Sequence, residues 1–343
     1  MTDYSNYASY HIFKGENIML NQKLCSIIFT LSLLISLTST AFAANLTSHD
    51  LSNGYITLTA KHGDVIISGS YDGYGAAIRV KDGYNGTITL DNATINAKRQ
   101  KLTPDEYRQS NSGSLDGFSA TYSAINIEYE TNVVINVVGD NKITGEHIGI
   151  YSISEEDLLL TGEGTLEIET SSSCGIIATK LIIDTETISS GIEASNLIIN
   201  KNTFSKGHLG IESGSLIINA ETTAISNGKD TAGIWANNIT INAKTKAKGN
   251  NGDGIHADNC ITINAPTYAE GRNGITADSY VSGFGSIIIK ADTTAIGTNG
   301  YGVYSNTNIT VDNATLTATG SSRGVKIGQG YKNVTIGTGK IIS

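Results

Sequence analysis

Hydrophobic and polar residues alternate in short runs along most of this chain, and the runs recur at a steady spacing. The clearest run is Gly-Ile-x-Ala, as in Gly191–Ala194 and Gly254–Ala257. In an extended strand, Ile and Ala fall on one face and x on the other. A Gly followed by Ile or Val begins nine such runs between Gly149 and Gly324, about 22 residues apart on average. A repeat of this length indicates a solenoid.

Two further strand-like pieces follow each Gly-Ile-x-Ala piece. The second is a β-branched run that ends in Asn or Asp, such as Ile239–Asn242 or Ile261–Asn264. The third is rich in Thr and Ala, such as Thr293–Ile296. The pattern therefore predicts an all-β chain that forms one parallel β-helix, with three short strands in each coil of 20–22 residues. Because parallel crossovers are right-handed in nearly all proteins, we expect a right-handed helix.

An Asx residue closes the second piece in several coils. Two interpretations are open. The side chains could form a hydrogen-bonded ladder along the axis, or Asn could simply tolerate left-handed backbone geometry at a turn. The residues at this position are Asn200, Asn219, Asn242, Asn264 and Asp312.

The N-terminal segment has the pattern of a secretory signal peptide over residues 1–43. Lys23 precedes an apolar run from Leu24 to Leu37, and small residues at Ala41 and Ala43 form a cleavage site. Residues 1–18 are polar and are interpreted as an extension upstream of a natural start at Met19. We therefore expect an exported protein, secreted or at the cell surface.

The mature chain, 44–343, is predicted to be β-helix throughout, with one protruding loop at about 98–121. This loop is polar, rich in Ser and Gly, and contains Pro104, one of only two prolines. Long loops on solenoids are either functional or without regular structure. No apolar segment after the signal peptide is long enough to span a membrane.

Charge and cysteine content indicate which partners, disulfides and metals to expect. A formal net charge of −9 disfavours binding to nucleic acid, which is a polyanion. Cys174 and Cys260 lie about four coils apart, which is roughly 19 Å at the spacing of neighbouring strands, too far for a disulfide. Both are predicted to be small buried side chains. No Cys/His pattern indicates zinc, and we expect no metal and no cofactor.

The x position of Gly-Ile-x-Ala predicts a row of outward side chains about 4.8 Å apart. Trp235, the only tryptophan, stands in this row, and an exposed aromatic ring suits stacking on a sugar. Alternatively, a loop covers Trp235 or it packs sideways on its row neighbours. The row comprises Glu193, Glu212, Trp235, His256, Thr276, Tyr304 and Lys326. The candidate ligand-binding residues are Trp235, His256, Tyr304, Glu212, Glu193, Asp258 and Asp278.

Several segments resemble a known family. They are Ser123–Gly145, Gly149–Glu169, Gly175–Asp184 and Gly86–Ile95. These segments are similar to secreted bacterial β-helix proteins described as carbohydrate-binding domain-containing, and the resemblance covers most of residues 55–330. It implies a non-catalytic, secreted or surface-associated protein that binds a glycan or cell-surface polysaccharide, or acts as an adhesin-like surface.

A second resemblance favours an enzyme. Asn251–Asn259 is similar to the N-x-D-G-I-D element of polygalacturonases, and Arg323–Lys326 is similar to their R-I-K element. The paired Asp and the Gly-His-Gly that those hydrolases need on the following coils are missing. A pectate-lyase-like Ca²⁺ site could use only Asp253, Asp258 and Asp278, with Arg272 as base. We therefore expect no catalytic residues, with a polysaccharide-degrading enzyme and a purely structural repeat as the alternatives.

Overall fold

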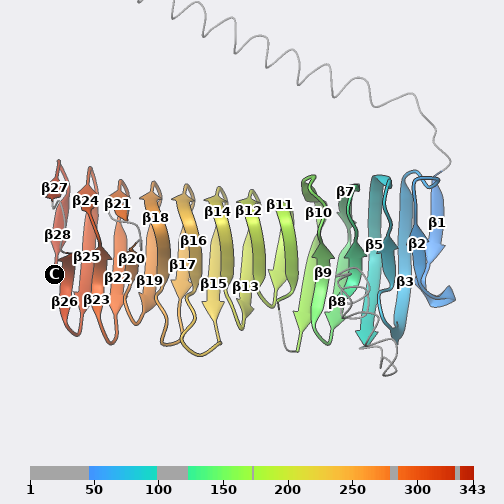
Figure 1. Cartoon of the computed structure of the whole chain (residues 1–343), viewed down its shortest axis with the longest axis horizontal. Coiled ribbons are helices and arrows are strands. Elements are labelled where there is room, and N and C mark those ends of the chain that lie inside the picture. The colour runs from blue at the N-terminus through green and yellow to red at the C-terminus, as the bar shows by residue number, and fades with distance from the viewer. Residues whose placement is uncertain (1–45, 99–122, 172–173, 279–284, 329–332) are drawn as a thin grey trace, which may run out of the picture. The chain divides into compact units, whose positions relative to one another are not determined.

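The computed structural model describes residues 46–98, 123–171, 174–278, 285–328 and 333–343. These residues form parallel strands stacked into a β-solenoid of about 11 turns, so the predicted parallel β-helix is confirmed (Figure 1). The one helical element among them is the short 3₁₀ turn η1 (Leu51–Asn53). The predicted signal peptide, 1–43, lies outside the described residues, as does the predicted loop beyond Lys98.

The strands are short and follow one another along the whole described chain. The first half comprises β1 (Thr47–Asp50), β2 (Ile56–Leu58), β3 (Val65–Tyr74), β4 (Ile78–Val80), β5 (Asn85–Lys98), β6 (Ser123–Ile127), β7 (Asn132–Val138), β8 (Asp140–Gly145), β9 (Ile148–Ser152), β10 (Leu158–Thr170), β11 (Ile176–Ser189), β12 (Ile192–Ile199), β13 (Thr203–Gly207) and β14 (Ile211–Ile218). The second half comprises β15 (Thr222–Ser226), β16 (Ile234–Ile241), β17 (Thr245–Lys248), β18 (Ile255–Ile263), β19 (Thr267–Gly271), β20 (Ile275–Ala277), β21 (Ser286–Ile289), β22 (Thr293–Gly297), β23 (Tyr301–Ser305), β24 (Asn308–Val311), β25 (Thr315–Gly320), β26 (Arg323–Ile327), β27 (Asn333–Ile336) and β28 (Lys340–Ile342).

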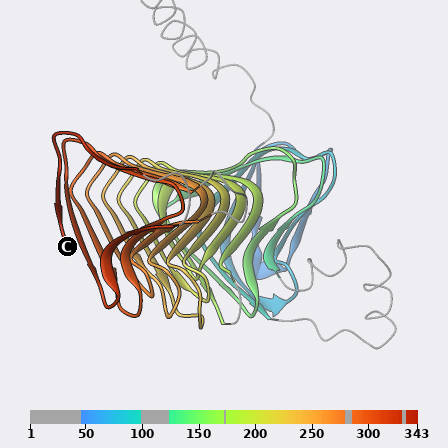
Figure 2. The ribbon, with the colours of Figure 1, turned by 60° about the vertical axis from the view of Figure 1, so that its left-hand side comes forward.

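Each strand pairs in parallel with the equivalent strand of the next coil. β12, β14 and β16 are consecutive neighbours in full register, and β18 pairs with β16 with one register shift at the corner. In these coils the predicted first and second pieces form one strand, and two successive outward residues, such as Ser195 and Asn196, mark the corner between them. From β20 onward the three pieces are separate strands, as predicted. Figure 2 shows the coils stacked one behind another.

The core runs through the centre of the coils as ladders of identical side chains. Ile192, Ile211, Ile234 and Ile255 pair in sequence and are all buried, and the Ala positions of the repeat are buried beside them. Burying one such isoleucine contributes about 1.5–3 kcal/mol. The predicted orientation of the repeat, with Ile and Ala inward, is therefore confirmed.

The glycine before each Ile is required by close packing between coils. A Cβ on Gly254 would lie 2.6 Å from the carbonyl oxygen of Gly274 in the next coil, and one on Gly274 would lie 2.5 Å from that of Gly302. In the series of nine, only Gly191 has a positive φ. Left-handed backbone geometry therefore does not explain the glycine at the other eight positions.

The Asx position forms a hydrogen-bonded ladder, as the first interpretation predicted. The Nδ2 atoms of Asn219, Asn242 and Asn264 each donate to the Oδ1 of the Asn one coil earlier, at 2.9, 2.9 and 2.8 Å. None of these residues has a positive φ, so the alternative interpretation is wrong here. Lys290 occupies the next place and separates the ladder from Asp312.

The two cysteines have different environments. Cys174 is buried, as predicted, whereas Cys260 is exposed, so the prediction of a buried side chain is wrong for it. Cys260 directly precedes the inward Ile261 and so occupies the outward position of Asn196, Ser215 and Asn238 in the preceding coils, with its Sγ beside Asn238. Both thiols are free.

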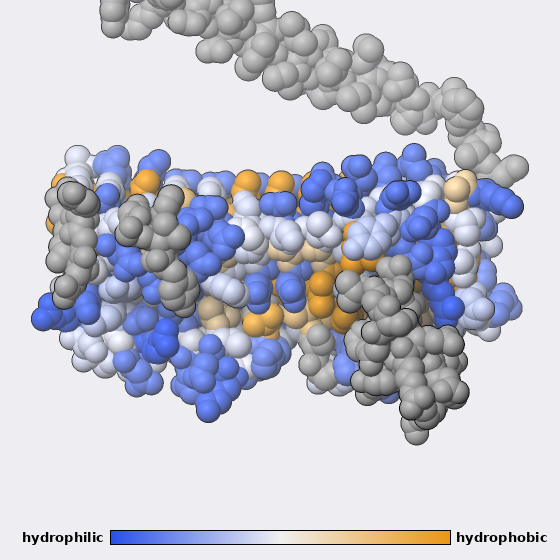
Figure 3. Space-filling model, viewed as in Figure 1, coloured by the Kyte–Doolittle hydropathy of each residue, from blue (hydrophilic) through white to orange (hydrophobic). Residues whose placement is uncertain are grey.

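The face of the solenoid drawn in Figure 3 is largely hydrophilic, but hydrophobic residues gather over its middle coils. The exposed large hydrophobic side chains include Ile188 and Phe204 on the third strand of the coil and Trp235 on the first. Within the described ranges, no helix has the length and apolar character needed to cross a bilayer.

Candidate functional site

The predicted outward row lies on the first strand of successive coils. Register pairs Glu193 with Glu212, Glu212 with Trp235, and Trp235 with His256. It continues through Thr276 and Tyr304 to Lys326, and toward the N-terminus through Ile177 and Tyr151. Thr276 departs from the prediction, because it is only 2% exposed. Its neighbours in the row carry much larger side chains, and their size leaves this short residue recessed.

Two grooves run along this row and meet at Trp235. The first, of about 550 Å³, extends from Tyr151 to Trp235 and is called here the Tyr151–Trp235 groove. The second, of about 360 Å³, lies between Trp235 and Arg272 and is called the His256 groove. Glu212 and Trp235 line both, so the two grooves form one track across consecutive coils.

Trp235 is exposed and at the same time held in place. Its side chain is 40% exposed, so no described loop covers it. The indole Nε1 donates to Asp258 Oδ1 at 3.3 Å, and the ring meets His256 edge to face at 6.4 Å between centroids. One side of the ring thus packs against the next coil and the rest remains open to a ligand.

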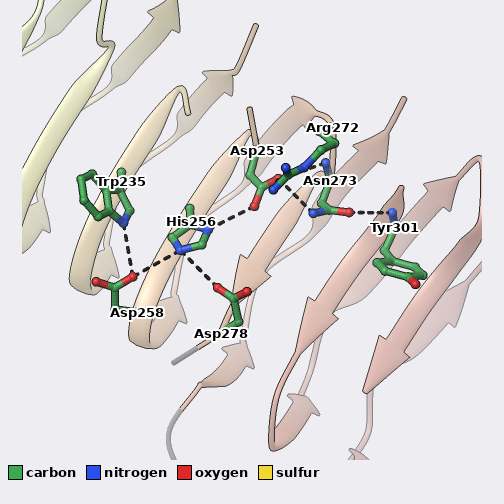
Figure 4. A network of polar contacts seen from close by, with 8 residues as sticks. All are labelled: Trp235, Asp253, His256, Asp258, Arg272, Asn273, Asp278 and Tyr301. Carbon is green, nitrogen blue, oxygen red and sulfur yellow. Dashed lines mark hydrogen bonds and ion pairs between the residues drawn. The ribbon is translucent and has the colours of Figure 1, made fainter. Parts of the chain in front are cut away.

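His256 is the centre of a polar network that joins residues of several consecutive coils (Figure 4). Its Nδ1 lies 3.1 Å from Asp253 Oδ2. Its Nε2 lies 3.3 Å from Asp258 Oδ1 and 3.2 Å from Asp278 Oδ1. Because each ring nitrogen faces a carboxylate, the arrangement favours an imidazolium that donates from both nitrogens.

Asp253 is the most deeply buried charged residue of the network. It is 3% exposed and stands just before β18. Its Oδ1 accepts hydrogen bonds from Asn273 Nδ2 at 2.9 Å and Asn273 N at 3.2 Å, and lies 3.4 Å from Arg272 Nη2. The Asn273 Oδ1 in turn accepts from Tyr301 N at 2.9 Å. Asp253 therefore links three successive coils.

The charges of the network shift the pKa values of its members. Burial opposes the charge of His256, but the hydrogen bond to Asp253 and the charges of Asp278 and Asp258 outweigh it, so the pKa of His256 is raised. Burial likewise opposes the charge of Asp253, but His256 and Arg272 outweigh it, so the pKa of Asp253 is lowered. Burial and the charges of Asp253 and Asp258 raise the pKa of Asp278.

This geometry limits the chemistry that the network can perform. A general base needs a free lone pair, and both His256 nitrogens already face carboxylates. The three aspartates that a lyase-like Ca²⁺ site would need converge on His256. In the part of the chain that the structure describes, no group of three or more His, Cys, Asp or Glu side chains is arranged to hold a metal ion.

The structure brings most of the sequence-predicted residues together. Trp235, His256, Asp258 and Asp278 form one network, and Glu193 and Glu212 continue the row beside it. Tyr304 is separate from this network. It lies two coils beyond His256, stacks on Tyr301 at 5.6 Å between centroids and donates to Asn306 Oδ1.

Sequence reasoning missed several members of the site. The sequence indicates Asp253 only as a possible ligand of a lyase-like Ca²⁺ site, and it does not single out Asn273. The only signal was their shared place just before Gly254 and Gly274 in adjacent coils, which puts them next to each other in the stack. Tyr151 was also missed, although it occupies the x position after Gly149-Ile150.

Searches against models of protein families, curated proteins and solved structures find no match to this chain.

Proposed function

We propose that this protein is an exported, non-catalytic β-helix that binds carbohydrate along the Trp235 row and so acts as an adhesin-like surface. The observation that carries the proposal is the Trp235 ring, which is 40% exposed, oriented by Asp258 and situated where two grooves meet. A fixed, exposed aromatic ring loses little conformational freedom when a sugar stacks on it.

The surroundings of Trp235 suit a sugar more than an apolar ligand. Carboxylates and an amide lie beside the ring at Glu212, Asp258 and Asn237, and they can accept hydrogen bonds from hydroxyl groups. The grooves follow the solenoid axis, so a linear glycan can contact several coils at once. Many weak contacts repeated along a chain would supply the affinity that one ring cannot.

A glycan array probed with the purified protein tests the proposal. We expect retention on one group of glycans and a loss of at least about tenfold in affinity for Trp235→Ala, because most of the stacking area is removed. The matched control is Phe204→Ala, since Phe204 is 39% exposed but lies on the third strand of its coil. Absence of retention, or equal effects of the two variants, would refute the proposal.

A second candidate is polysaccharide hydrolysis, favoured by Asp278, whose carboxylate lies 3.2 Å from His256 Nε2 and whose pKa is raised by burial. A carboxyl group that stays protonated at higher pH can act as the general acid for glycosidic bond cleavage. Release of reducing sugar from neutral and uronic polysaccharides, lost in Asp278→Asn, would establish it and replace the binding proposal. A purely structural repeat would be silent in this assay and on the array.

A further inference from the structure

We propose that the Tyr151–Trp235 groove selects a basic glycan, one whose sugar residues carry protonated amino groups, and that Glu193 and Glu212 bind those groups. This inference rests on the proposed carbohydrate binding and adds the chemical class of the ligand. It assigns the two glutamates as specificity-determining residues.

The groove carries charge of only one sign. Among the described residues that line it, Glu193 and Glu212 are the only charged ones. They stand directly opposite each other on β12 and β14, one strand spacing apart, and both are half-buried. The nearest basic residue on these strands and on β11 is Lys180, which lies past the corner in the row of Asn196 and Ser215.

Several carboxylates elsewhere on the solenoid are paired with lysines of adjacent coils. Lys142 Nζ lies 3.1 Å from Glu167 Oε1, and Lys248 Nζ lies 2.9 Å from Glu270 Oε1. Within the described residues, neither groove glutamate has such an ion pair. The Cys174 Sγ lies 3.9 Å from Glu193 Oε2, and burial raises the pKa of this thiol to about 12, so it stays neutral and does not compensate the carboxylate charge.

Like charges opposite each other in a sheet destabilise it, and partial burial increases the cost. Burial and the charge of Glu193 together raise the pKa of Glu212, which is the electrostatic sign of this conflict. A ligand ammonium group bound between the two carboxylates would remove the repulsion between them through charge-assisted hydrogen bonds. The same carboxylates would repel a uronate.

The aromatic residues favour an amino sugar over another cation. Trp235 follows Glu212 by one coil, so a sugar ring stacked on the indole lies one strand spacing from the carboxylate. Tyr151 stands at the other end of the groove, and Ile177 and Ala178 provide apolar surface between the two rings. A linear chain of stacked sugar rings can use all of these contacts, whereas a small inorganic cation can use only the carboxylates.

Isothermal titration with three hexamers, of glucosamine, N-acetylglucosamine and galacturonate, tests the inference at a pH where the free amines are protonated. We expect the glucosamine hexamer to bind about tenfold or more tightly than the N-acetyl hexamer, because the latter lacks the ammonium groups. Glu212→Gln and Glu193→Gln should each reduce this preference. Glu221→Gln, which changes an exposed glutamate bonded to Lys244 just before the third strand of the coil, is the control and should leave it intact.

The outcomes separate this inference from the proposed function. Equal or tighter binding of the N-acetyl or galacturonate hexamer, still lost in Trp235→Ala, would overturn the basic-glycan inference and leave carbohydrate binding in place. Binding of none of the hexamers, together with a silent glycan array, would overturn both. Tighter binding of a lysine hexamer than of the glucosamine hexamer, with the same dependence on Glu212, would identify a basic peptide surface and also overturn the inference.

Discussion

Replacing Asp253 with alanine tests whether the His256 network is a structural anchor. The substitution removes an acceptor that receives Asn273 Nδ2 at 2.9 Å, His256 Nδ1 at 3.1 Å and Asn273 N at 3.2 Å. Asp253 is 3% exposed, so water cannot easily replace these bonds. Removing one partner of a buried, hydrogen-bonded charge pair costs about 3–5 kcal/mol, and we expect a loss of this size in the free energy of unfolding.

Urea unfolding followed by both Trp235 fluorescence and far-UV circular dichroism measures this loss. Two probes are needed because a solenoid can unfold coil by coil, and the indole reports on the coil next to Asp253. Asp82→Ala, which changes an exposed aspartate on a turn, is the control. If Asp253→Ala stays within about 0.5 kcal/mol of the unsubstituted protein, the anchor reasoning is wrong. Asp253 would then be a candidate for chemistry instead.

Three further predictions concern the network and the stack. The raised pKa of His256 means that its charge stabilises the fold fully below about pH 6.5 and that this contribution disappears as the pH rises through the folded pKa. The difference in urea midpoint between the unsubstituted protein and His256→Gln should therefore be largest near pH 6 and shrink at alkaline pH; a constant difference contradicts the assignment. Asn219→Ala removes two ladder hydrogen bonds and should lower the free energy of unfolding by about 1–3 kcal/mol, measured by urea titration; no change would mean that the ladder contributes nothing. Gly254→Ala places a Cβ 2.6 Å from backbone atoms, among them the carbonyl oxygen of Gly274 in the next coil, and should lower the melting temperature, with a loss of about 1–3 kcal/mol in the free energy of unfolding. Gly63→Ala is the control, because nothing lies within 4 Å of its Cβ, and it should leave the melting temperature unchanged. Equal melting temperatures of the two variants would show that the coils can move apart.

Much of the architecture is a local property and could be predicted from the residues alone. Alternation with a period of two assigns each side chain to a face, and the repeat places equivalent residues in neighbouring coils. The inward Ile and Ala, the alignment of the Asn residues in successive coils and the position of Trp235 beside His256 all follow from these two facts. The same reasoning predicted the candidate row, because row neighbours share one position in the repeat.

Some assignments failed because burial and contact depend on neighbours outside the repeat. Thr276 has the sequence position of an exposed residue but is buried. Cys260 is a different case, because it directly precedes the inward Ile261 and alternation alone places it outward. Asp253 stands just before Gly254 in the sequence, yet its role comes from Asn273 and His256, which reach it from the next coil and from its own.

The sequence by itself determined the parallel β-helix, the inward and outward faces and the row that holds Trp235, because each depends only on strand periodicity and a constant repeat length. Only the tertiary structure decided how the row works as a surface. Whether a carboxylate meets a lysine, as Glu270 does, or stays without an ion pair, as Glu212 does in the described chain, depends on the lengths and orientations of side chains from separate coils. Those interactions give the grooves their charge, and the repeat does not encode them.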